Sequence, residues 1–328
     1  MNRSSSISSG GPSSTGTLAC ALFLLLLNVF ATHLALAKKH PPKRPRILGI
    51  AGVTILGSDV PAAHRYYRDL VDPDHSCDYC VSVSSPYLFL PSGQRITFKS
   101  MPAPAPSDLL ADISFLTDDL EGFRRYLDFR KVQPDERRKK HGGELISLMF
   151  QDPEGHHLSI TDAYHLANSE DLKVGLPPSN PSNPVRIIHA GIVVNDRALI
   201  DRFYVDVLGF RPYWHGGMTD DTTSWVAMQI PDGTDWVEYM LNIRANADKR
   251  TLGVMNHIAL GVPDIHARQK EIIASGVQPK EEPKIGRDGK WQLNLYDSDL
   301  TRIEFMEFRP VEKPCCSEFT GPHPGPKQ

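Results

Sequence analysis

Two histidines and two glutamates recur at matching points of a repeated pattern in the second half of the chain. His189 lies in the apolar run 187–194 and His257 in the apolar run 257–262. Each run leads into a helical stretch and then into further strand-like runs, the last of which carries Glu238 or Glu304. Similarity at a fixed period indicates duplicated structural units. We therefore expect residues 186–310 to fold as a βαβββ unit used twice.

Alternation along these runs places the four polar side chains on one face of the predicted sheet, because successive side chains of a strand point to opposite faces. The opposite face should pack against the helices. We assign to that packed face the side chains of Ile188, Ala190, Ile192, Val194, Val237, Tyr239, Leu241, Ile258, Leu260, Val262, Ile303 and Phe305. If the two units curl into one cupped sheet, the two imidazoles and the two carboxylates converge.

A divalent cation would explain why such groups interrupt apolar strands, since burying a charge or an imidazole is unfavourable without a partner. A single histidine in an apolar strand is more often a hydrogen-bonded core residue, and a single glutamate on an edge strand usually faces solvent. Recurrence of all four at equivalent points favours a metal site. Two imidazoles and two carboxylates suit Zn, Ni, Co, Mn or Fe(II), and residue type alone does not choose among them.

The first half of the chain follows the same plan over residues 46–165. Aligned by eye, the positions of His189, Glu238, His257 and Glu304 are taken there by Ile50, Thr97, Asp112 and Ser159. Only Asp112 is a good metal ligand, so we expect a degenerate module without metal ligands that supports or shapes the pocket. A linker rich in Pro, Ser and Asn at 171–185 separates the modules, and a disordered tail is expected at 311–328.

The N-terminus has the pattern of a cleaved secretory signal over residues 1–37. An apolar run from Leu18 to Phe30 precedes an A-x-A site that ends at Ala37. The alternative is an uncleaved N-terminal anchor, since 18–37 could just span a bilayer. We expect a secreted or periplasmic protein with no stable membrane insertion after the signal is removed.

Composition and charge exclude several partners. With 40% hydrophobic and 23% charged residues the chain is typical of a globular protein, and its net charge of -3 gives no pull toward nucleic acid. Cys20 would leave with the signal. The remaining four cysteines allow three pairings in an oxidising compartment, and we assign no chemistry to any of them: Cys77, Cys80, Cys315 and Cys316.

Five segments together resemble the vicinal oxygen chelate (VOC) superfamily, which includes glyoxalase I, extradiol dioxygenases and bleomycin-resistance proteins. They are HAGIVV, FYVDVLGFRP, VEYML, NHIALGV and YDSDLTRIEF. The last segment departs from the superfamily's usual ending at Ser298, Leu300 and Thr301. The resemblance implies an α+β fold of two tandem VOC modules, each made of paired βαβββ units that form a cupped mixed sheet.

The resemblance also implies a reaction. In this superfamily a metal binds two vicinal oxygens of a small-molecule substrate and stabilises a developing enolate-type oxygen as a Lewis acid. The ligand order His, Glu, His, Glu is similar to that of glyoxalase-like lyases or isomerases, in which a metal-bound carboxylate also moves a proton. Glu304 and Glu238 are the candidates for that role. An exported protein would have little access to glutathione, which argues against an ordinary methylglyoxal glyoxalase.

Two other functions stay open. An extradiol ring-cleaving dioxygenase would hold Fe(II) through His189, His257 and Glu304, although Glu238 would then fill a position that dioxygen and catechol need. A binding or sequestration protein, as in bleomycin resistance, would use the same cup without catalysis.

The substrate pocket is predicted from side chains near the ligands. Trp236, Met240 and Met306 share the ligand face, and Tyr296 remains where extradiol dioxygenases have a tyrosine. Core packing explains the first three about as well. Whether the chain forms a homodimer stays open, because the duplicated module could supply within one chain the partner that a second subunit would otherwise provide.

Overall fold

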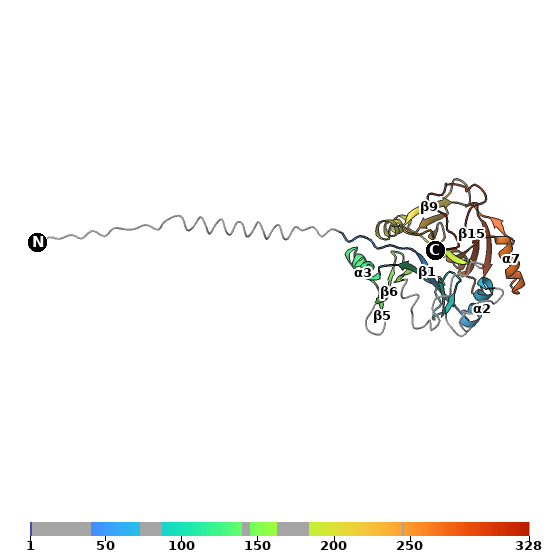
Figure 1. The fold of residues 1–328 in the computed structure, drawn as a ribbon, viewed down its shortest axis with the longest axis horizontal. Coiled ribbons are helices and arrows are strands. Elements are labelled where there is room, and N and C mark those ends of the chain that lie inside the picture. Colours follow the sequence, from blue (N-terminus) through green and yellow to red (C-terminus); the bar gives the residue numbers. More distant parts are fainter. Residues whose placement is uncertain (2–40, 73–86, 140–144, 163–183, 245, 328) are drawn as a thin grey trace. The chain divides into compact units, whose positions relative to one another are not determined.

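The structure is a computed structural model that describes residues 1, 41–72, 87–139, 145–162, 184–244 and 246–327. The chain divides into two compact units, Met1–Pro42 and Lys43–Gln328, and every element below belongs to the second (Figure 1). Apart from Met1, the predicted signal lies outside the described residues, as does most of the predicted linker. Among the described residues, no helix has the length and apolar character needed to cross a membrane.

The first module is a seven-stranded mixed sheet with strand order β2-β3-β1-β4-β7-β6-β5. Its two central strands, β1 and β4, are antiparallel, and each pairs in parallel with the strand on its other side. The elements in chain order are β1 (Gly49–Gly57), α2 (Val60–Val71), β2 (Tyr87–Phe89), β3 (Arg95–Ser100), β4 (Leu110–Thr117), α3 (Leu120–Phe129), β5 (Glu136–Lys139), β6 (Leu145–Gln151) and β7 (His157–Asp162).

The second module is an eight-stranded mixed sheet with order β13-β14-β15-β12-β8-β11-β10-β9. It contains the two predicted βαβββ units. The first is β8 (Arg186–Val193), α5 (Arg197–Asp201), the π-helical η1 (Arg202–Val207), β9 (Arg211–Gly216), β10 (Trp225–Gln229) and β11 (Trp236–Met240); α6 (Lys249–Met255) follows, and the second is β12 (His257–Val262), α7 (Ile265–Ala274), β13 (Lys284–Ile285), β14 (Trp291–Tyr296) and β15 (Arg302–Glu307). The predicted α+β fold of two curled mixed sheets is confirmed.

Each crossover helix begins with an aspartate that caps it. The side chains of Asp59, Asp119, Asp196 and Asp264 each accept a hydrogen bond from a backbone N–H in the first turn of their helix. Such a cap satisfies a donor that has no partner within the helix. The same residue type therefore starts the crossover in all four units of the duplicated chain.

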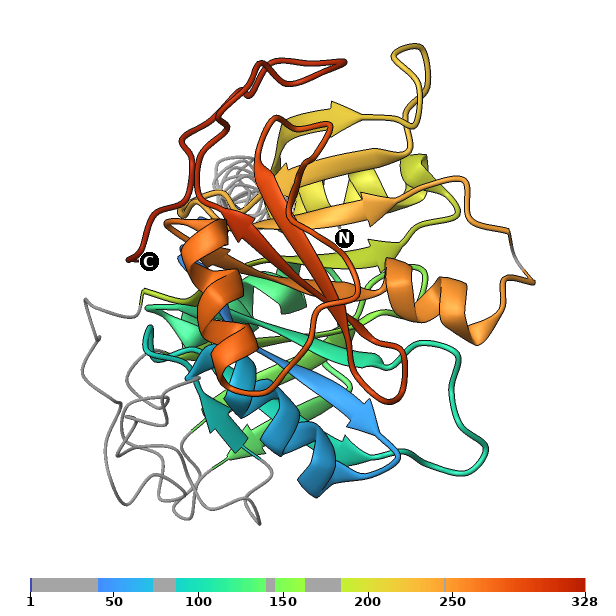
Figure 2. The same ribbon diagram turned by 90° about the vertical axis from the view of Figure 1, so that its right-hand side faces the viewer.

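The two sheets lie side by side and share one hydrophobic core (Figure 2). Two buried polar side chains join them at strands β1 and β8. The Gln94 amide donates to the carbonyls of Ile50 and Ile187, both at 2.8 Å, and accepts from the Ile187 N–H at 2.7 Å. Asp235 accepts from the Ile50 N–H at 2.9 Å and pairs with the fully buried Arg186.

A second hydrophobic cluster lines the opposite face of the second sheet. It consists of Ile188, Tyr213, Trp214, Ala227, Trp236, Ala259, Met306 and Phe308. The predicted facing is confirmed for Val237, Ile258 and Phe305, which lie in the main core, but it is wrong for Ile188. The pairing of β8 with β12 shifts between Ile187 and His189, so Ile188 falls in a β-bulge, which breaks the alternation.

The C-terminal segment Val311–Lys327 is packed against the second module, which corrects the prediction of a disordered tail. Its backbone follows β9, with the Thr320 N–H donating to the Tyr213 carbonyl at 3.0 Å. The Phe319 ring lies against Tyr213 and Trp214. Tyr213 and Trp214 of the edge strand β9 give the segment an apolar surface to cover, and both are buried. Cys315 and Cys316, to which we assigned no chemistry, form a disulfide.

Candidate metal centre

The strand register brings the four predicted ligands around the centre of the second sheet. Gly191 of β8 is paired with His257 of β12 on one side and with Glu238 of β11 on the other. Ala259 of β12 is paired with His189 and with Glu304 of β15. All four side chains therefore project from neighbouring strands on the same face.

Their donor atoms converge within a small volume. The Nε2 atoms of His189 and His257 are 3.1 Å apart. The Oε2 atom of Glu304 lies 3.6 and 3.5 Å from these two nitrogens, and the Oε2 atom of Glu238 lies 3.8 and 3.6 Å from them. His189, Glu238 and His257 form a set of ligand atoms that all lie within 4.8 Å of one another.

This geometry fits a divalent cation. Bonds of about 2.0–2.2 Å to imidazole nitrogen and carboxylate oxygen place neighbouring donors roughly 3.0–3.5 Å apart. The Nδ1 atom of His257 lies 2.7 Å from the Met255 carbonyl, a partner for an Nδ1–H that would leave Nε2 free as a ligand. Two imidazoles and two carboxylates, with both imidazoles fully buried, form a donor set suited to a transition metal.

A glycine on the neighbouring strand leaves room for the His257 ring. A Cβ atom on Gly191 would lie 2.1 Å from Cε1 of His257 and 2.2 Å from its Nδ1. Any larger residue would displace the imidazole, because such contacts are far below van der Waals separation. Gly191 therefore provides the room for the His257 ring.

The two carboxyl groups have pKa values shifted in opposite directions. Burial, together with the charge of Glu304, raises the pKa of Glu238 to about 8. For Glu304, burial favours the neutral acid, but the Arg302 charge and a hydrogen bond with His257 outweigh it and lower the pKa to about 2. Burial lowers the pKa of both His189 and His257, which favours the neutral imidazole that a metal requires.

Arg302 is a component of the site that our sequence reasoning missed. One of its guanidinium nitrogens lies 2.7 Å from Nε2 of His257, so it would have to move for a cation to bond to that nitrogen. Among the described residues, its Nε has no hydrogen-bond partner. The strand alternation could have found it, since Arg302 is two residues before Glu304 and shares its face.

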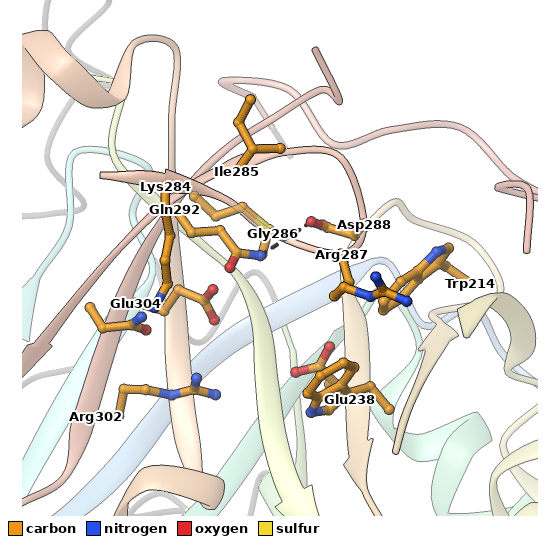
Figure 3. Close-up of a pocket in the computed structure, with 13 residues that line it drawn as sticks. Trp214, Glu238, Lys284, Ile285, Gly286, Arg287, Asp288, Gln292, Arg302 and Glu304 are labelled. Atoms are coloured by element: carbon orange, nitrogen blue, oxygen red, sulfur yellow. Dashed lines mark hydrogen bonds between the residues drawn. The ribbon is translucent and has the colours of Figure 1, made fainter. Parts of the chain in front are cut away.

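A cavity of about 340 Å³ opens onto the two carboxylates. Glu238, Glu304 and Arg302 line it, and Arg287 and Trp214 form part of its wall (Figure 3). The remaining lining residues are Trp225, Lys284, Ile285, Gly286, Asp288, Gln292, Asn294 and Met306. Its floor is therefore charged, and part of its wall is aromatic.

Only one of the four predicted pocket residues lies at this wall. Met306 lines the cavity, as expected. Trp236 is buried against His189, with ring centroids 4.7 Å apart, and Met240 is buried in the sheet. Tyr296 donates to Glu281 at 3.2 Å instead of facing the cavity. Trp236, Met240 and Met306 were predicted from strand alternation. Alternation indicates the face of the sheet on which a residue lies, but not its distance from the cavity opening.

Comparison with known proteins identifies the family. A sequence model of the Glyoxalase/Bleomycin resistance protein/Dioxygenase superfamily matches residues 186–305, which make up nearly all of the second module. Lactoylglutathione lyase of Haemophilus influenzae is 30% identical over 125 residues, which cover 38% of this chain and 93% of that enzyme. The chain belongs to this superfamily. The resemblance seen in the sequence is thereby confirmed.

Solved structures resemble the chain over more than the second module. A variant of homoprotocatechuate 2,3-dioxygenase from Brevibacterium fuscum aligns with a TM-score of 0.56 at 20% identity, covering 87% of this chain and 76% of that chain. The same dioxygenase in complex with 3,4-dihydroxyphenylacetate aligns with a TM-score of 0.54 at 20% identity, covering 82% of each chain. At this identity the likeness concerns the fold alone.

Proposed function

We propose that the second module binds one divalent cation through His189, Glu238, His257 and Glu304 and acts as a glyoxalase-like lyase or isomerase on a small oxygenated molecule. The observation that carries this proposal is the position of Glu238. Its Oε2 lies 3.8 and 3.6 Å from the two imidazole nitrogens, near the spacing of roughly 3.0–3.5 Å between neighbouring ligands of one cation. Glu238 is therefore placed to act as a fourth ligand.

The cation would act as a Lewis acid that stabilises negative charge developing on a substrate oxygen. The side chains have separate roles around it. Glu304, which is held ionised, and the two neutral imidazoles fix the centre in place. Glu238 is the more exposed carboxylate, with 13% of its side chain accessible against 4% for Glu304, and it faces the cavity.

We assign proton transfer to Glu238. It is the carboxylate that faces the cavity, where a bound substrate would lie within its reach, as a general acid or base requires. Arg302, Arg287 and Lys284 at the cavity would favour a substrate that carries negative charge.

An extradiol dioxygenase is the second candidate, because the aligned dioxygenase structures cover both modules. In that case His189, His257 and Glu304 would hold Fe(II), and Glu238 would lie outside the ligand set. Sequestration of a small molecule without catalysis is the third candidate. Both alternatives predict that Glu238 does not bind the metal.

Elemental analysis of the purified protein, followed by two assays, separates these functions. We expect one Zn, Ni, Co or Mn per chain and oxygen-independent turnover of thiol hemiacetals or related hydroxycarbonyl compounds. E238Q should lower turnover by about 100-fold or more, the usual range for loss of a general base, while D112N in the first module should leave it unchanged. Iron with oxygen uptake on catechols would establish the dioxygenase instead, and a metal-free, inactive protein would overturn both enzymes.

We also propose that the protein is exported. The signal-like pattern at 1–37 supports export. Mass analysis of the mature chain purified from its own cells would reveal cleavage after Ala37, and an intact N-terminus would support the anchor alternative.

A homodimer is a separate proposal that light scattering of the purified protein would test.

A further inference from the structure

A lysine amine is buried behind the candidate metal centre. Lys290 lies in the turn between β13 and β14, its side chain is fully buried, and among the described residues its Nζ has no hydrogen-bond partner. Three aromatic rings surround that amine. Nζ lies 4.5 Å from the ring centroid of Trp236, 5.2 Å from that of Phe319 and 5.8 Å from that of Tyr213. A cation at such distances is attracted to the faces of the rings.

Trp236 connects this amine to a metal ligand. Its indole ring lies against the imidazole of His189, with centroids 4.7 Å apart and ring planes inclined by 33°. The indole N–H is buried and has no hydrogen-bond partner among the described residues. The orientation of the indole is therefore set by its contacts with His189, Lys290 and Tyr213.

His189 depends on this packing more than His257 does. The Nδ1 atom of His257 is held by the Met255 carbonyl, which orients the ring. The Nδ1 atom of His189 is buried, and no partner for it exists among the described residues. A metal-bound histidine usually has its second nitrogen fixed by a hydrogen bond. For His189, contact with Trp236 takes the place of that hydrogen bond.

The C-terminal segment contributes one of the three rings. Phe319 is held in place by backbone hydrogen bonds on both sides along the segment. The Cys315 N–H donates to the Arg287 carbonyl at 2.9 Å, the Thr320 N–H donates to the Tyr213 carbonyl, and the Tyr213 hydroxyl lies 2.6 Å from Nδ1 of His323. The segment thus fixes Phe319 against the Lys290 amine from outside the sheet.

We propose that the C-terminal segment is part of the metal centre: Phe319 and Tyr213 enclose the Lys290 amine over Trp236, and this stack holds His189 with its Nε2 toward the other three ligands. Trp236, Lys290 and Phe319 are positioning residues in this arrangement, because each acts on the metal through His189. The inference rests on the proposed metal site. It adds to it a requirement for residues beyond 310.

Phe319 is the best place to test the stack. Lys290 also acts on the ligand carboxylates through its charge, so replacing it changes two properties at once. Phe319 is uncharged and touches the ligands only through the stack. We would compare wild type with F319A, F319L and F319Y, and with V311A as a matched control, since Val311 lies in the same segment with 53% of its surface exposed.

The measurements are Zn²⁺ affinity by calorimetry and the visible spectrum of the Co²⁺-loaded protein. We expect F319A and F319L to lower Zn²⁺ affinity by about 10-fold, the lower end for loss of a group that orients a ligand, and to change the Co²⁺ bands. F319Y, which keeps the ring, and V311A should match wild type. A purely structural role would lower the melting temperature of the metal-free protein and leave the Co²⁺ bands unchanged.

The outcomes separate the inference from the proposed function. If wild type binds neither Zn²⁺ nor Co²⁺, the metal site itself is wrong. If wild type binds and the folded F319A and F319L variants match it in affinity and spectrum, the stack does not position His189 and the inference is wrong. Should F319A fail to fold, F319L carries the test, because leucine fills the apolar site but presents no ring face to the amine.

Discussion

The two modules have one topology but different contents at equivalent positions. In the second module, Gly191 of β8 is paired with Glu238 of β11 and with His257 of β12, and the ligand His189 lies two residues before Gly191. In the first, Thr54 takes the place of Gly191, being paired with Thr97 and Asp112 as Gly191 is with Glu238 and His257. The equivalent of His189 is therefore Gly52. Our alignment by eye had placed Ile50 there.

This correction explains why the equivalent positions of the first module do not form a comparable site. A Cβ atom on Gly52 would lie 2.2 Å from the backbone oxygen of Arg95, so no histidine fits at that position. The remaining equivalents satisfy one another, as Ser159 donates to Asp112 at 2.9 Å. The same bulge precedes the position in both modules, at Ala51 and at Ile188. Duplication thus preserved the strand geometry and lost the space for a ligand.

The largest expected effect concerns the join between the modules. D235A removes the partner of the buried Arg186 and the acceptor of the Ile50 N–H. An uncompensated buried charge costs about 3–5 kcal/mol, so we expect that loss in the free energy of unfolding measured with denaturant. D118N, which breaks the exposed Arg46–Asp118 pair, should cost about 1 kcal/mol or less. Equal losses would show that Asp235 does not join the modules.

The second prediction compares equivalent ligand positions. H257A should weaken metal binding by about 100-fold or more, since losing even a group that orients a ligand costs 10- to 100-fold. D112A, the same change at the equivalent position of the first module, should leave metal affinity unchanged. Calorimetric titration with Zn²⁺ measures both. A loss of binding in D112A would place a metal in the first module.

The third prediction compares two glycines. G191A and G52A should each destabilise the protein by about 1–3 kcal/mol, because each forces a methyl group into occupied space. Only G191A should also reduce metal affinity, since its methyl displaces His257 whereas that of G52A meets the backbone of Arg95. Thermal unfolding with and without Zn²⁺ tests this. Matched losses of affinity would contradict the assignment of these roles.

The smallest expected effect concerns pH and Lys290. Burial lowers the pKa of this amine from 10.5 to about 8. Between those values the unfolded chain binds the extra proton, so the stability of wild type should rise with pH. From pH 8 to pH 9 we expect wild type to gain about 1 kcal/mol relative to K290M, as one pKa unit corresponds to 1.36 kcal/mol. A constant difference, measured by urea unfolding, would indicate an ordinary pKa.

Much of this arrangement could be predicted from the sequence, because repeats and alternation are local signals. The recurrence of His and Glu gave the four converging side chains, and apolar runs gave the strands that carry them. The bulge at Ile188 could not be predicted, since a single extra residue leaves no mark in the pattern of apolar residues. The alignment of Ile50 with His189 was wrong by two residues, and alternation could not reveal this because a shift of two keeps every side chain on its predicted face.

Contacts between distant segments were beyond sequence reasoning. Composition made the C-terminal segment look unstructured, yet Phe319 and His323 find aromatic partners on β9. The cavity wall is formed by loops and strand ends whose approach depends on how the sheet curls, which explains why Trp214 and Arg287 were missed while Met306 was found. Periodicity predicts on which face of the sheet a side chain lies, but not how far it lies from the opening of the cavity.

The side-chain amide of Gln94, in the first module, supports strand β8 of the second module. It hydrogen-bonds both backbone polar groups of Ile187, the N–H and the carbonyl. Ile187 lies one residue before the bulge and two residues before His189. A fragment of residues 186–310 would lack Gln94, so the backbone groups of Ile187 would lose their hydrogen-bond partners. Strand β8 would then be less well ordered next to His189. We therefore expect a fragment of residues 186–310 to bind metal more weakly than the full chain.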